Sequence, residues 1–152
     1  MPIFQLDNNS NWFPDESLWD EKEGIVAIGS EINARRLKCA YQNGIFPWNE
    51  PDSEILWWSP LERMVLRPED VHISKSSRNL LIQKKFKITF NQAFDQVIEN
   101  CRDICRPGQS GTWITEEHLE SFKTLHKEGW AHSVEAWKDG NLIGGLYGLT
   151  IG

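Results

Sequence analysis

The segment from residue 131 to residue 151 constrains the fold most, because it predicts a long β-hairpin. Two runs of strand-forming residues, 131–137 and 142–151, flank the dipeptide Asp139-Gly140, which is a strong hairpin-turn signal. The second run is apolar or glycine at nearly every position and contains no charged residue. Native proteins pair or cover the edge of such a strand. We therefore expect the chain to be the N-terminal fragment of a longer protein, whose remainder covers this strand.

Three amphipathic helices are expected upstream of the hairpin. Asn33 and Gly44 are residue types that begin and end a helix, and so are Thr115 and Gly129. Asn91 is expected to cap the helix between these two. In this middle helix apolar side chains recur with helical spacing at Phe94, Val97, Ile98 and Cys101. Each helix therefore has one face that must pack against another element.

Strands and a short basic helix are expected to alternate with these helices. Apolar runs predict strands at 25–28, 64–66 and 86–90, with the basic helix at 74–84. This alternation indicates an α+β fold. The 152 residues fit one domain or two small ones. Near residue 62 the balance of acidic and basic residues changes, and a compact alternation of expected strands and helices begins. We therefore predict a small N-terminal domain, residues 1–62, followed by a second domain, residues 63–152.

Residues 45–60 hold three tryptophans between prolines, which fix the backbone and remove hydrogen-bond donors. We therefore predict that this segment is a stiff aromatic surface and not the middle of a sheet. Trp48, Trp57 and Trp58 in this segment, and Trp113 beside a glycine-containing loop, lie where bulky side chains often line a cleft. Of these, Trp48 and Trp113 are expected to belong to a site, where an indole can stack on a nucleobase. A place in the core is the better interpretation for Trp12, Trp19 and Trp137.

A local basic patch interrupts an otherwise acidic chain. The net charge is −6, yet no Asp or Glu occurs between Val71 and Phe94. The basic residues of this stretch are Lys75, Arg78, Lys84, Lys85 and Lys87. Such a patch on an acidic protein is expected when one face meets phosphate groups. A solvated helix face is the alternative interpretation.

The sequence lacks the common catalytic and cofactor-binding motifs. It contains no P-loop, no GxGxxG, no HExxH and no GxSxG. His118, His126 and His132 do not share a metal-ligand spacing, and the odd number of 3 cysteines favours reduced thiols over disulfides or a zinc site. No window approaches the roughly 18 consecutive apolar residues of a membrane span. We therefore expect no metal, no cofactor and no membrane partner.

Six short motifs occur in the order and spacing that one protein family shows. They are Gly-Ile-Phe-Pro-Trp, Leu-Trp-Trp-Ser-Pro, His-Ile-Ser, Gly-Thr-Trp-Ile-Thr, Ala-His-Ser-Val-Glu and Gly-Gly-Leu-Tyr-Gly, at residues 44–48, 56–60, 72–74, 111–115, 131–135 and 144–148. On these motifs the chain resembles the leucyl/phenylalanyl-tRNA-protein transferases, over nearly all of its length from Phe13 onward.

The resemblance implies an aminoacyltransferase of the bacterial cytoplasm. Such an enzyme moves leucine or phenylalanine, and less readily methionine, from aminoacyl-tRNA to the N-terminal Arg or Lys of a protein, which marks that protein for degradation. The implied fold is a small N-terminal domain followed by a domain like that of the GCN5-related acetyltransferases, and no cofactor is implied. The family's proposed catalytic carboxylates and glutamine lie in motifs beyond a strand like 142–151. The resemblance therefore implies no catalytic residue within residues 1–152.

Binding residues are implied as well. Trp48 and Trp113 match tryptophans that help form the site for the terminal adenosine and aminoacyl group of the tRNA. Leu146 matches a position in the apolar pocket for the side chain of the amino acid. The basic residues expected at the phosphates of the tRNA acceptor stem are Lys75 and Arg78, with Lys84 and Lys85 at neighbouring positions. Positions of this cluster that can be basic in other members hold Asn79, Ile82 and Gln83.

Two other functions stay open at the level of the sequence. One is an acyl-CoA-dependent acetyltransferase relative, although residues 1–152 show no glycine-rich pyrophosphate loop leading into a helix. The other is a noncatalytic, aromatic-rich module that binds RNA or a peptide. Turnover of acetyl-CoA would favour the first, and binding without turnover would favour the second.

Overall fold

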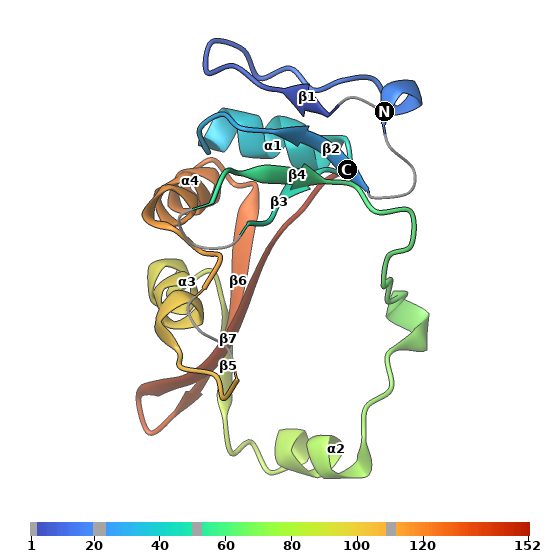
Figure 1. Ribbon diagram of the computed structural model, residues 1–152. Helices are drawn as coiled ribbons and strands as arrows, with labels where there is room; N and C mark the ends of the chain where they lie inside the picture. Colours follow the sequence, from blue (N-terminus) through green and yellow to red (C-terminus); the bar gives the residue numbers. More distant parts are fainter. Residues whose placement is uncertain (1–2, 20–23, 50–52, 109–111) are drawn as a thin grey trace.

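Helices and strands alternate along the chain in the computed structural model, which describes residues 3–19, 24–49, 53–108 and 112–152 (Figure 1). The helices are α1 (Ala34–Gln42), α2 (Lys75–Ile82), α3 (Phe94–Asp103) and α4 (Glu116–Lys127), with 3-10 turns at Glu16–Leu18 and Pro68–Asp70. The strands form two sheets. The predicted α+β fold class is therefore confirmed.

Polar side chains fix where α1, α2 and α4 begin. Asn33, Ser74 and Thr115 each accept a hydrogen bond from the backbone N–H three residues further on. This bond satisfies one of the free amides that every helix leaves in its first turn. At the far ends, Gly44 and Gly129 have φ angles of 70° and 80°, which suit the residue that follows a helix. The predicted limits of these helices are confirmed to within about two residues.

The first sheet lies in the N-terminal part of the chain. It contains β1 (Phe4–Gln5), β2 (Ile25–Ile28), β3 (Phe46–Pro47) and β4 (Leu56–Trp58) in the order β1-β2-β4-β3. The strand predicted at 25–28 is confirmed, but the prediction that residues 45–60 avoid the middle of a sheet is wrong, because β4 lies between two strands. The prolines permit this since Pro47 lies in the edge strand β3 and Pro60 follows the end of β4.

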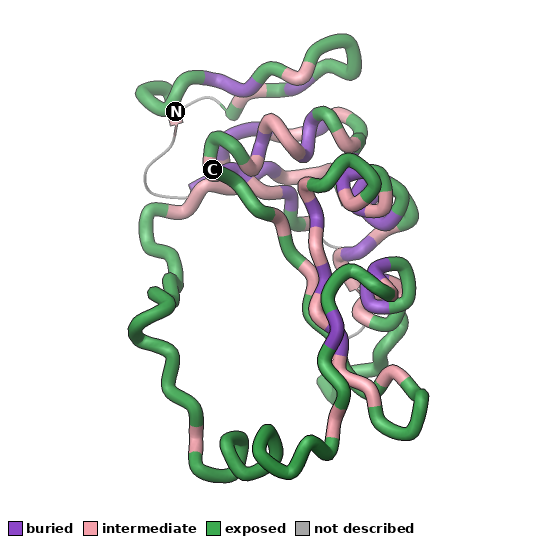
Figure 2. The backbone as a smooth tube through the Cα atoms, turned by 180° about the vertical axis from the view of Figure 1, so that it is seen from behind, coloured by how far each residue is buried: buried purple, intermediate pink, exposed green. Residues whose placement is uncertain are grey.

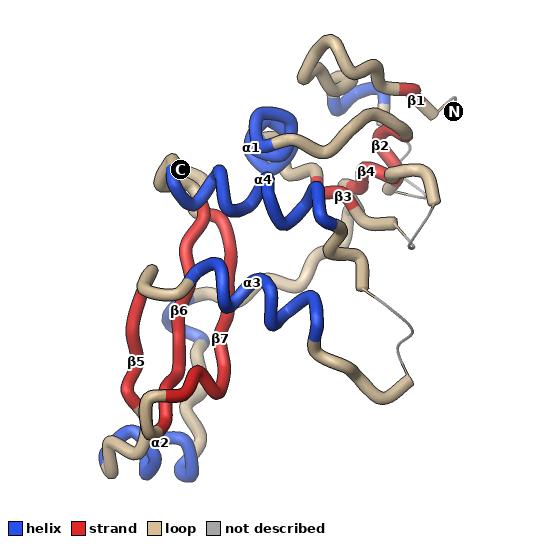
Figure 3. The backbone as a smooth tube through the Cα atoms, turned by 90° about the vertical axis from the view of Figure 1, so that its left-hand side faces the viewer, coloured by secondary structure: helices blue, strands red, loops and turns tan. Residues whose placement is uncertain are grey.

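The second sheet consists of β5 (Lys87–Phe90), β6 (Ala131–Lys138) and β7 (Asn141–Leu149), which run antiparallel side by side in that order (Figure 3). The predicted hairpin is confirmed, because Asp139 and Gly140 have the two positive φ angles, 51° and 81°, of a type I′ turn. Helices α3 and α4 pack on one face. On the opposite face Phe90 and Leu146 are 68% and 70% exposed, and no described helix covers them.

Asn91 does not cap α3, so that prediction is wrong. The N-cap of α3 is Ala93, whose side chain makes no capping bond. Asn91 has a φ angle of 56°, a left-handed conformation that asparagine tolerates better than most residues. Its Oδ1 accepts a hydrogen bond of 2.9 Å from the backbone N–H of Ser133, and its Nδ2 lies 3.0 Å from Nδ1 of His132. Asn91 therefore ties the end of β5 to β6 instead of starting the helix.

The chain between β4 and β5, residues 59–86, bows away from the sheets as a largely exposed arc (Figure 2). The strand predicted at 64–66 is wrong, since these residues form no strand and Met64 is 98% exposed. A short apolar run becomes a strand only where a neighbour pairs with its backbone groups, and no described strand does so here. The basic helix predicted at 74–84 is confirmed as α2, which contacts no other described helix or strand.

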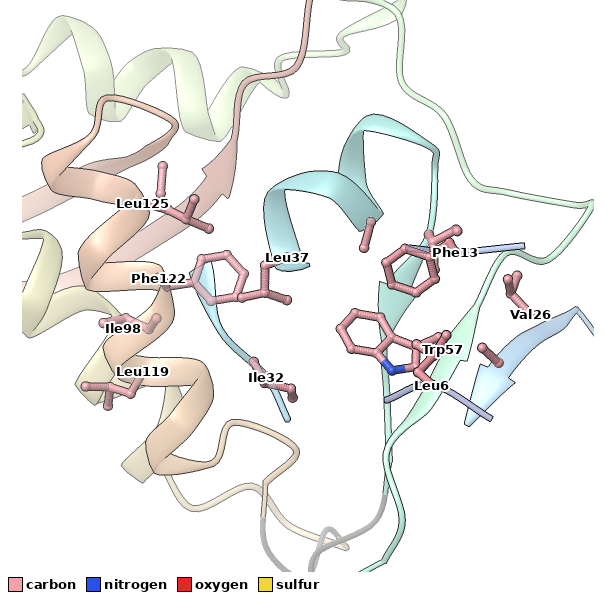
Figure 4. Close-up of a cluster of buried hydrophobic side chains, with 14 of the residues drawn as sticks. Leu6, Phe13, Val26, Ile32, Leu37, Trp57, Ile98, Leu119, Phe122 and Leu125 are labelled. Carbon is pink, nitrogen blue, oxygen red and sulfur yellow. The ribbon is translucent and has the colours of Figure 1, made fainter. Parts of the chain in front are cut away.

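One cluster of buried side chains in the described residues links the two sheets (Figure 4). It includes Trp57 of β4, Leu37 of α1 and Phe122 of α4. The first sheet and α1 precede the boundary predicted near residue 62, and the second sheet with α3 and α4 follows it. The division into two domains stays a prediction because one core serves both parts, and so does the likeness to the GCN5-related acetyltransferases.

We expect Gly145→Ala to destabilise the fold by about 1–3 kcal/mol, because β7 runs directly against α3. A Cβ atom on Gly145 would lie 2.7 Å from Cγ2 and 2.9 Å from Cγ1 of Val97. A β-branched side chain in a helix has one preferred rotamer and cannot turn away. The midpoint of urea unfolding measures the loss. Gly148→Ala is the control, since a Cβ there meets no atom within 4 Å. Equal midpoints for the two variants would contradict the close approach.

Candidate functional site

Trp48 combines a fixed backbone with an accessible indole. It follows β3, where its N–H donates to the carbonyl of Leu56 at 2.9 Å. Its own carbonyl accepts a hydrogen bond of 2.7 Å from Nε1 of Trp58. The centroids of the Trp48 and Trp58 rings are 6.3 Å apart, and Trp48 is 58% exposed. The side chain is therefore presented on a stable hairpin, as a stacking surface requires.

Trp113 lies on the short segment that leads into α4. Its carbonyl accepts a hydrogen bond of 3.1 Å from the N–H of Thr115, the N-cap of the helix. Its indole is half-buried and meets the imidazole of His118 edge to face, with centroids 5.2 Å apart and planes at 90°. Trp113 is thus held at the start of α4 with part of its ring accessible.

His118 was not predicted as a site residue, because the histidines share no metal-ligand spacing in the sequence. It is fully buried, and its Nδ1 lies 2.9 Å from Oγ1 of Thr115. Its Nε2 is buried and has no hydrogen-bond partner among the described residues. Burial lowers the pKa of His118 to about 4, so the ring is neutral at pH 7. The available signal was its place three residues after the N-cap, where side chains reach back to the cap.

Leu146 lies on the uncovered face of the second sheet. It pairs with Val134 of β6, which in turn pairs with Phe90 of β5, so three apolar side chains form a row across the sheet. Gly148, two residues along β7 on the same face, leaves the space beside Leu146 open. This geometry offers an apolar surface with room beside it, as the predicted pocket for an amino acid side chain needs.

The predicted phosphate-binding residues are all exposed. Lys75 and Arg78 lie three residues apart on α2 and therefore on the same side of the helix. Lys84 has a φ angle of 48° and, with Lys85, follows the end of α2. The ion pairs recorded within the described residues involve none of these four cations. They are therefore available to an external anion.

The predicted site residues stand on separate elements. Within the described part of the chain, no hydrogen bond or ring contact joins Trp48, Trp113 and Leu146 to one another. The basic residues lie on the arc between β4 and β5, which carries none of the three (Figure 1). The assembly of these residues into one site therefore stays a prediction.

Glu135 is a second feature that the sequence reading missed. Its carboxylate is fully buried and accepts hydrogen bonds from the hydroxyls of Thr89 and Ser133 and, at 3.4 Å, from the N–H of Ala93. Burial would raise the pKa of Glu135, but these hydrogen bonds hold it below its ordinary value. The carboxylate links β5, β6 and the start of α3, so its hydrogen bonds stabilise the fold. The available signal was the strand alternation, which puts Glu135 on the inward face with Ser133.

The described residues contain no group of three or more His, Cys, Asp or Glu side chains placed to hold a metal ion. Cys39, Cys101 and Cys105 are free thiols. Among the described helices, none has the length and apolar character needed to cross a bilayer.

Two family models match the chain. The model described as leucyl/phenylalanyl-tRNA protein transferase N-terminal domain matches residues 30–61, and the model described as leucyl/phenylalanyl-tRNA protein transferase matches residues 65–152.

Curated relatives named leucyl/phenylalanyl-tRNA–protein transferase are similar to the chain. The relative from Flavobacterium johnsoniae is 51% identical over 141 residues, which are 93% of this chain and 66% of the relative. The relative from Syntrophus aciditrophicus is 49% identical over 140 residues, 92% of this chain and 58% of the relative. The relative from Myxococcus xanthus is 46% identical over 153 residues, 100% of this chain and 65% of the relative. The chain therefore spans between 58% and 66% of the length of these three proteins.

Proposed function

Because the chain belongs to the leucyl/phenylalanyl-tRNA protein transferase family, we propose that it serves the transfer of leucine or phenylalanine, and less readily methionine, from aminoacyl-tRNA to the N-terminal Arg or Lys of a protein. The observation that carries this proposal is the identity of 51% over 93% of the chain. The product would be a protein marked for degradation. The reaction would take place in the bacterial cytoplasm, where charged tRNA is found.

We propose substrate binding as the role of residues 1–152, since the family resemblance implies no catalytic residue among them. Trp48 and Trp113 would stack on the terminal adenosine, and such stacking contributes about 1–3 kcal/mol per base. The row of Phe90, Val134 and Leu146 would bury the side chain of leucine or phenylalanine, with about 0.8 kcal/mol gained per CH₂ group. The accessible indole of Trp48 and the open space beside Leu146 support these roles.

The chemistry would be aminolysis of the aminoacyl ester. The α-amine of the acceptor protein attacks the ester carbonyl, a C–N bond forms, and the 3′ oxygen of the tRNA leaves after taking up a proton. The activated ester supplies the driving force, so the enzyme mainly aligns the amine, helps to remove its proton and stabilises the oxyanion. A rigid aromatic site for the adenosine contributes the alignment.

A binding and transfer experiment tests the proposal. Radiolabelled leucyl-tRNA is added to this chain or to the relative from Flavobacterium johnsoniae, together with a peptide that begins with Arg. We expect this chain to bind leucyl-tRNA more tightly than uncharged tRNA, and the relative to form leucyl-peptide. If single-stranded RNA bound this chain as tightly as leucyl-tRNA does, the binding-module alternative would be favoured. Binding of acetyl-CoA in place of leucyl-tRNA would favour the acetyltransferase alternative.

We expect the double substitution Lys75→Glu/Arg78→Glu to weaken binding of leucyl-tRNA about tenfold near 0.1 M salt. Loss of two phosphate contacts should also reduce the slope of log affinity against log salt by about 2. Filter binding over a range of salt concentrations measures both quantities. Arg35→Glu, at an exposed position in the first turn of α1, reverses one charge elsewhere and is the control. An unchanged slope in the double variant would mean that α2 is only a solvated helix.

A further inference from the structure

We propose that His118 is a positioning residue that holds the indole of Trp113 in the orientation needed to stack on the terminal adenosine. The proposal rests on the function proposed above, because that function gives Trp113 its role. It assigns a part to a side chain that no substrate needs to touch.

Two facts distinguish His118 from the other described histidines. It is fully buried, and one of its ring nitrogens, Nε2, has no hydrogen-bond partner among the described residues. Buried polar atoms in native proteins nearly always have a partner, so an orphan nitrogen needs an explanation. The ring contact recorded for His118 is with Trp113.

We assign the proton of the neutral ring to Nε2, the tautomer in which the hydroxyl of Thr115 donates to Nδ1. Oγ1 of Thr115 accepts the backbone N–H of His118 at 3.4 Å, and it lies 2.9 Å from Nδ1. A hydroxyl group has one proton to donate, and Nδ1 is an acceptor within reach. Donation to Nδ1 places the single proton of the neutral ring on Nε2. The ring is neutral at pH 7, because burial lowers the pKa of His118 to about 4.

With this tautomer, we assign the indole of Trp113 as the group that the Nε2–H faces, because it is the ring in edge-to-face contact with the imidazole. The two rings meet at 90° with centroids 5.2 Å apart, a geometry in which the edge of one ring faces the π surface of the other. An N–H directed at an aromatic face is a weak but genuine hydrogen bond. His118 is itself fixed by Thr115, which caps α4. Thr115 at the start of α4 therefore fixes the imidazole of His118, and the imidazole in turn orients the indole of Trp113.

Removing this contact should leave Trp113 in place but free to turn. Its backbone would still be held by the hydrogen bond from Thr115, which does not involve His118. A mobile indole must be ordered each time a ligand binds, and we expect this cost to weaken binding about 2- to 10-fold. The effect on affinity is thus smaller than that of deleting the indole.

Two substitutions separate positioning from helix capping. In His118→Asn the amide lies near the former Nδ1, so the contact with Thr115 can persist while the group facing Trp113 is lost. In His118→Gln the amide reaches the former position of Nε2, so an N–H can still face Trp113. A positioning role predicts rescue by Gln and not by Asn. A role in capping alone predicts the reverse.

The experiment reads the orientation of Trp113 and the affinity separately. Chains labelled with 5-fluorotryptophan give a fluorine resonance for Trp113, identified by its loss in Trp113→Phe. Calorimetry measures binding of 3′-leucylamino-3′-deoxyadenosine, a stable analogue of the tRNA terminus. We expect His118→Asn to shift and broaden the Trp113 line and to weaken binding about 2- to 10-fold. His118→Gln should remain close to the unsubstituted chain in both measurements.

Every other outcome contradicts a specific part of the proposal. An unchanged Trp113 line in both variants, or rescue by Asn alone, overturns the positioning role of His118. The stacking function of Trp113 is wrong if the analogue binds the unsubstituted chain and Trp113→Ala with equal affinity, or if it binds neither of these chains. In both cases the fluorine line still decides whether His118 orients the ring. Should both variants unfold, nitrogen NMR of His118 in the unsubstituted chain decides, because a proton on Nδ1 would contradict the assigned contact.

Discussion

Trp57→Ala should lower the free energy of unfolding by about 3–5 kcal/mol, a large part of the roughly 5–15 kcal/mol that stabilises a typical domain. Trp57 is fully buried in β4 and packs edge to face on Phe13, with centroids 5.0 Å apart. Its Nε1 donates a hydrogen bond of 3.0 Å to the carbonyl of Gly29. Alanine would leave both a large cavity and a buried carbonyl without its donor. Urea unfolding followed by circular dichroism measures the loss.

Trp12→Ala is the matched control for this result. Trp12 also contacts a phenylalanine edge to face, Phe4, with centroids 6.1 Å apart, but it is 54% exposed. Its truncation removes little buried surface, so we expect a loss of about 1 kcal/mol or less. Similar losses for the two variants would mean that the side chain of Trp57 does not lie in the buried core.

The sequence was informative wherever structure depends on near neighbours. Asn33, Ser74 and Thr115 cap helices because a short polar side chain reaches an amide three residues away. The turn at Asp139-Gly140 forms for a similar reason, since both residues tolerate a positive φ. These local rules need no knowledge of the rest of the fold. The helices and the hairpin could therefore be predicted.

Predictions failed where a distant partner decides the outcome. Met64, Val65 and Leu66 have the composition of a strand, but no described strand pairs with them. Asn91 is a residue type that often caps helices, but its side chain instead accepts a hydrogen bond from the N–H of Ser133 on β6. Strand pairing and competition for a donor depend on segments far away in the sequence. A single sequence does not show which partner wins.

The candidate site divides in the same way. Trp48 and Leu146 could be chosen from motifs, and their exposure is compatible with binding. Glu135 ends the motif at residues 131–135, but no motif assigns a role to Glu135 or His118, because what distinguishes them is burial of a titratable group. Glu135 accepts three hydrogen bonds and has a lowered pKa, whereas His118 has an unpartnered nitrogen and a lowered pKa. Only the contacts separate a satisfied structural carboxylate from a candidate positioning residue.

Acid should destabilise the chain by about 3 kcal/mol through His118 alone. The ordinary pKa of a histidine is 6.5, and burial lowers the pKa of His118 to about 4. The stabilising contribution is fully present above pH 6.5. As the pH falls from there toward 4, the unfolded state binds a proton that the folded state does not. The free energy of unfolding then falls by about 1.4 kcal/mol per pH unit.

Urea midpoints at a series of pH values, for the unsubstituted chain and for His118→Gln, measure this slope. Glutamine does not titrate, so the difference between the two curves should narrow as the pH falls below 6.5. Glu135 cannot produce this effect, because its pKa lies below its ordinary value of 4.5 and its contribution is lost only in stronger acid. A difference that stays constant with pH would mean that His118 is solvated or charged in the folded chain. A charged imidazole carries protons on both nitrogens, so Thr115 could no longer donate to Nδ1, and the neutral contact assigned to Trp113 would also be wrong.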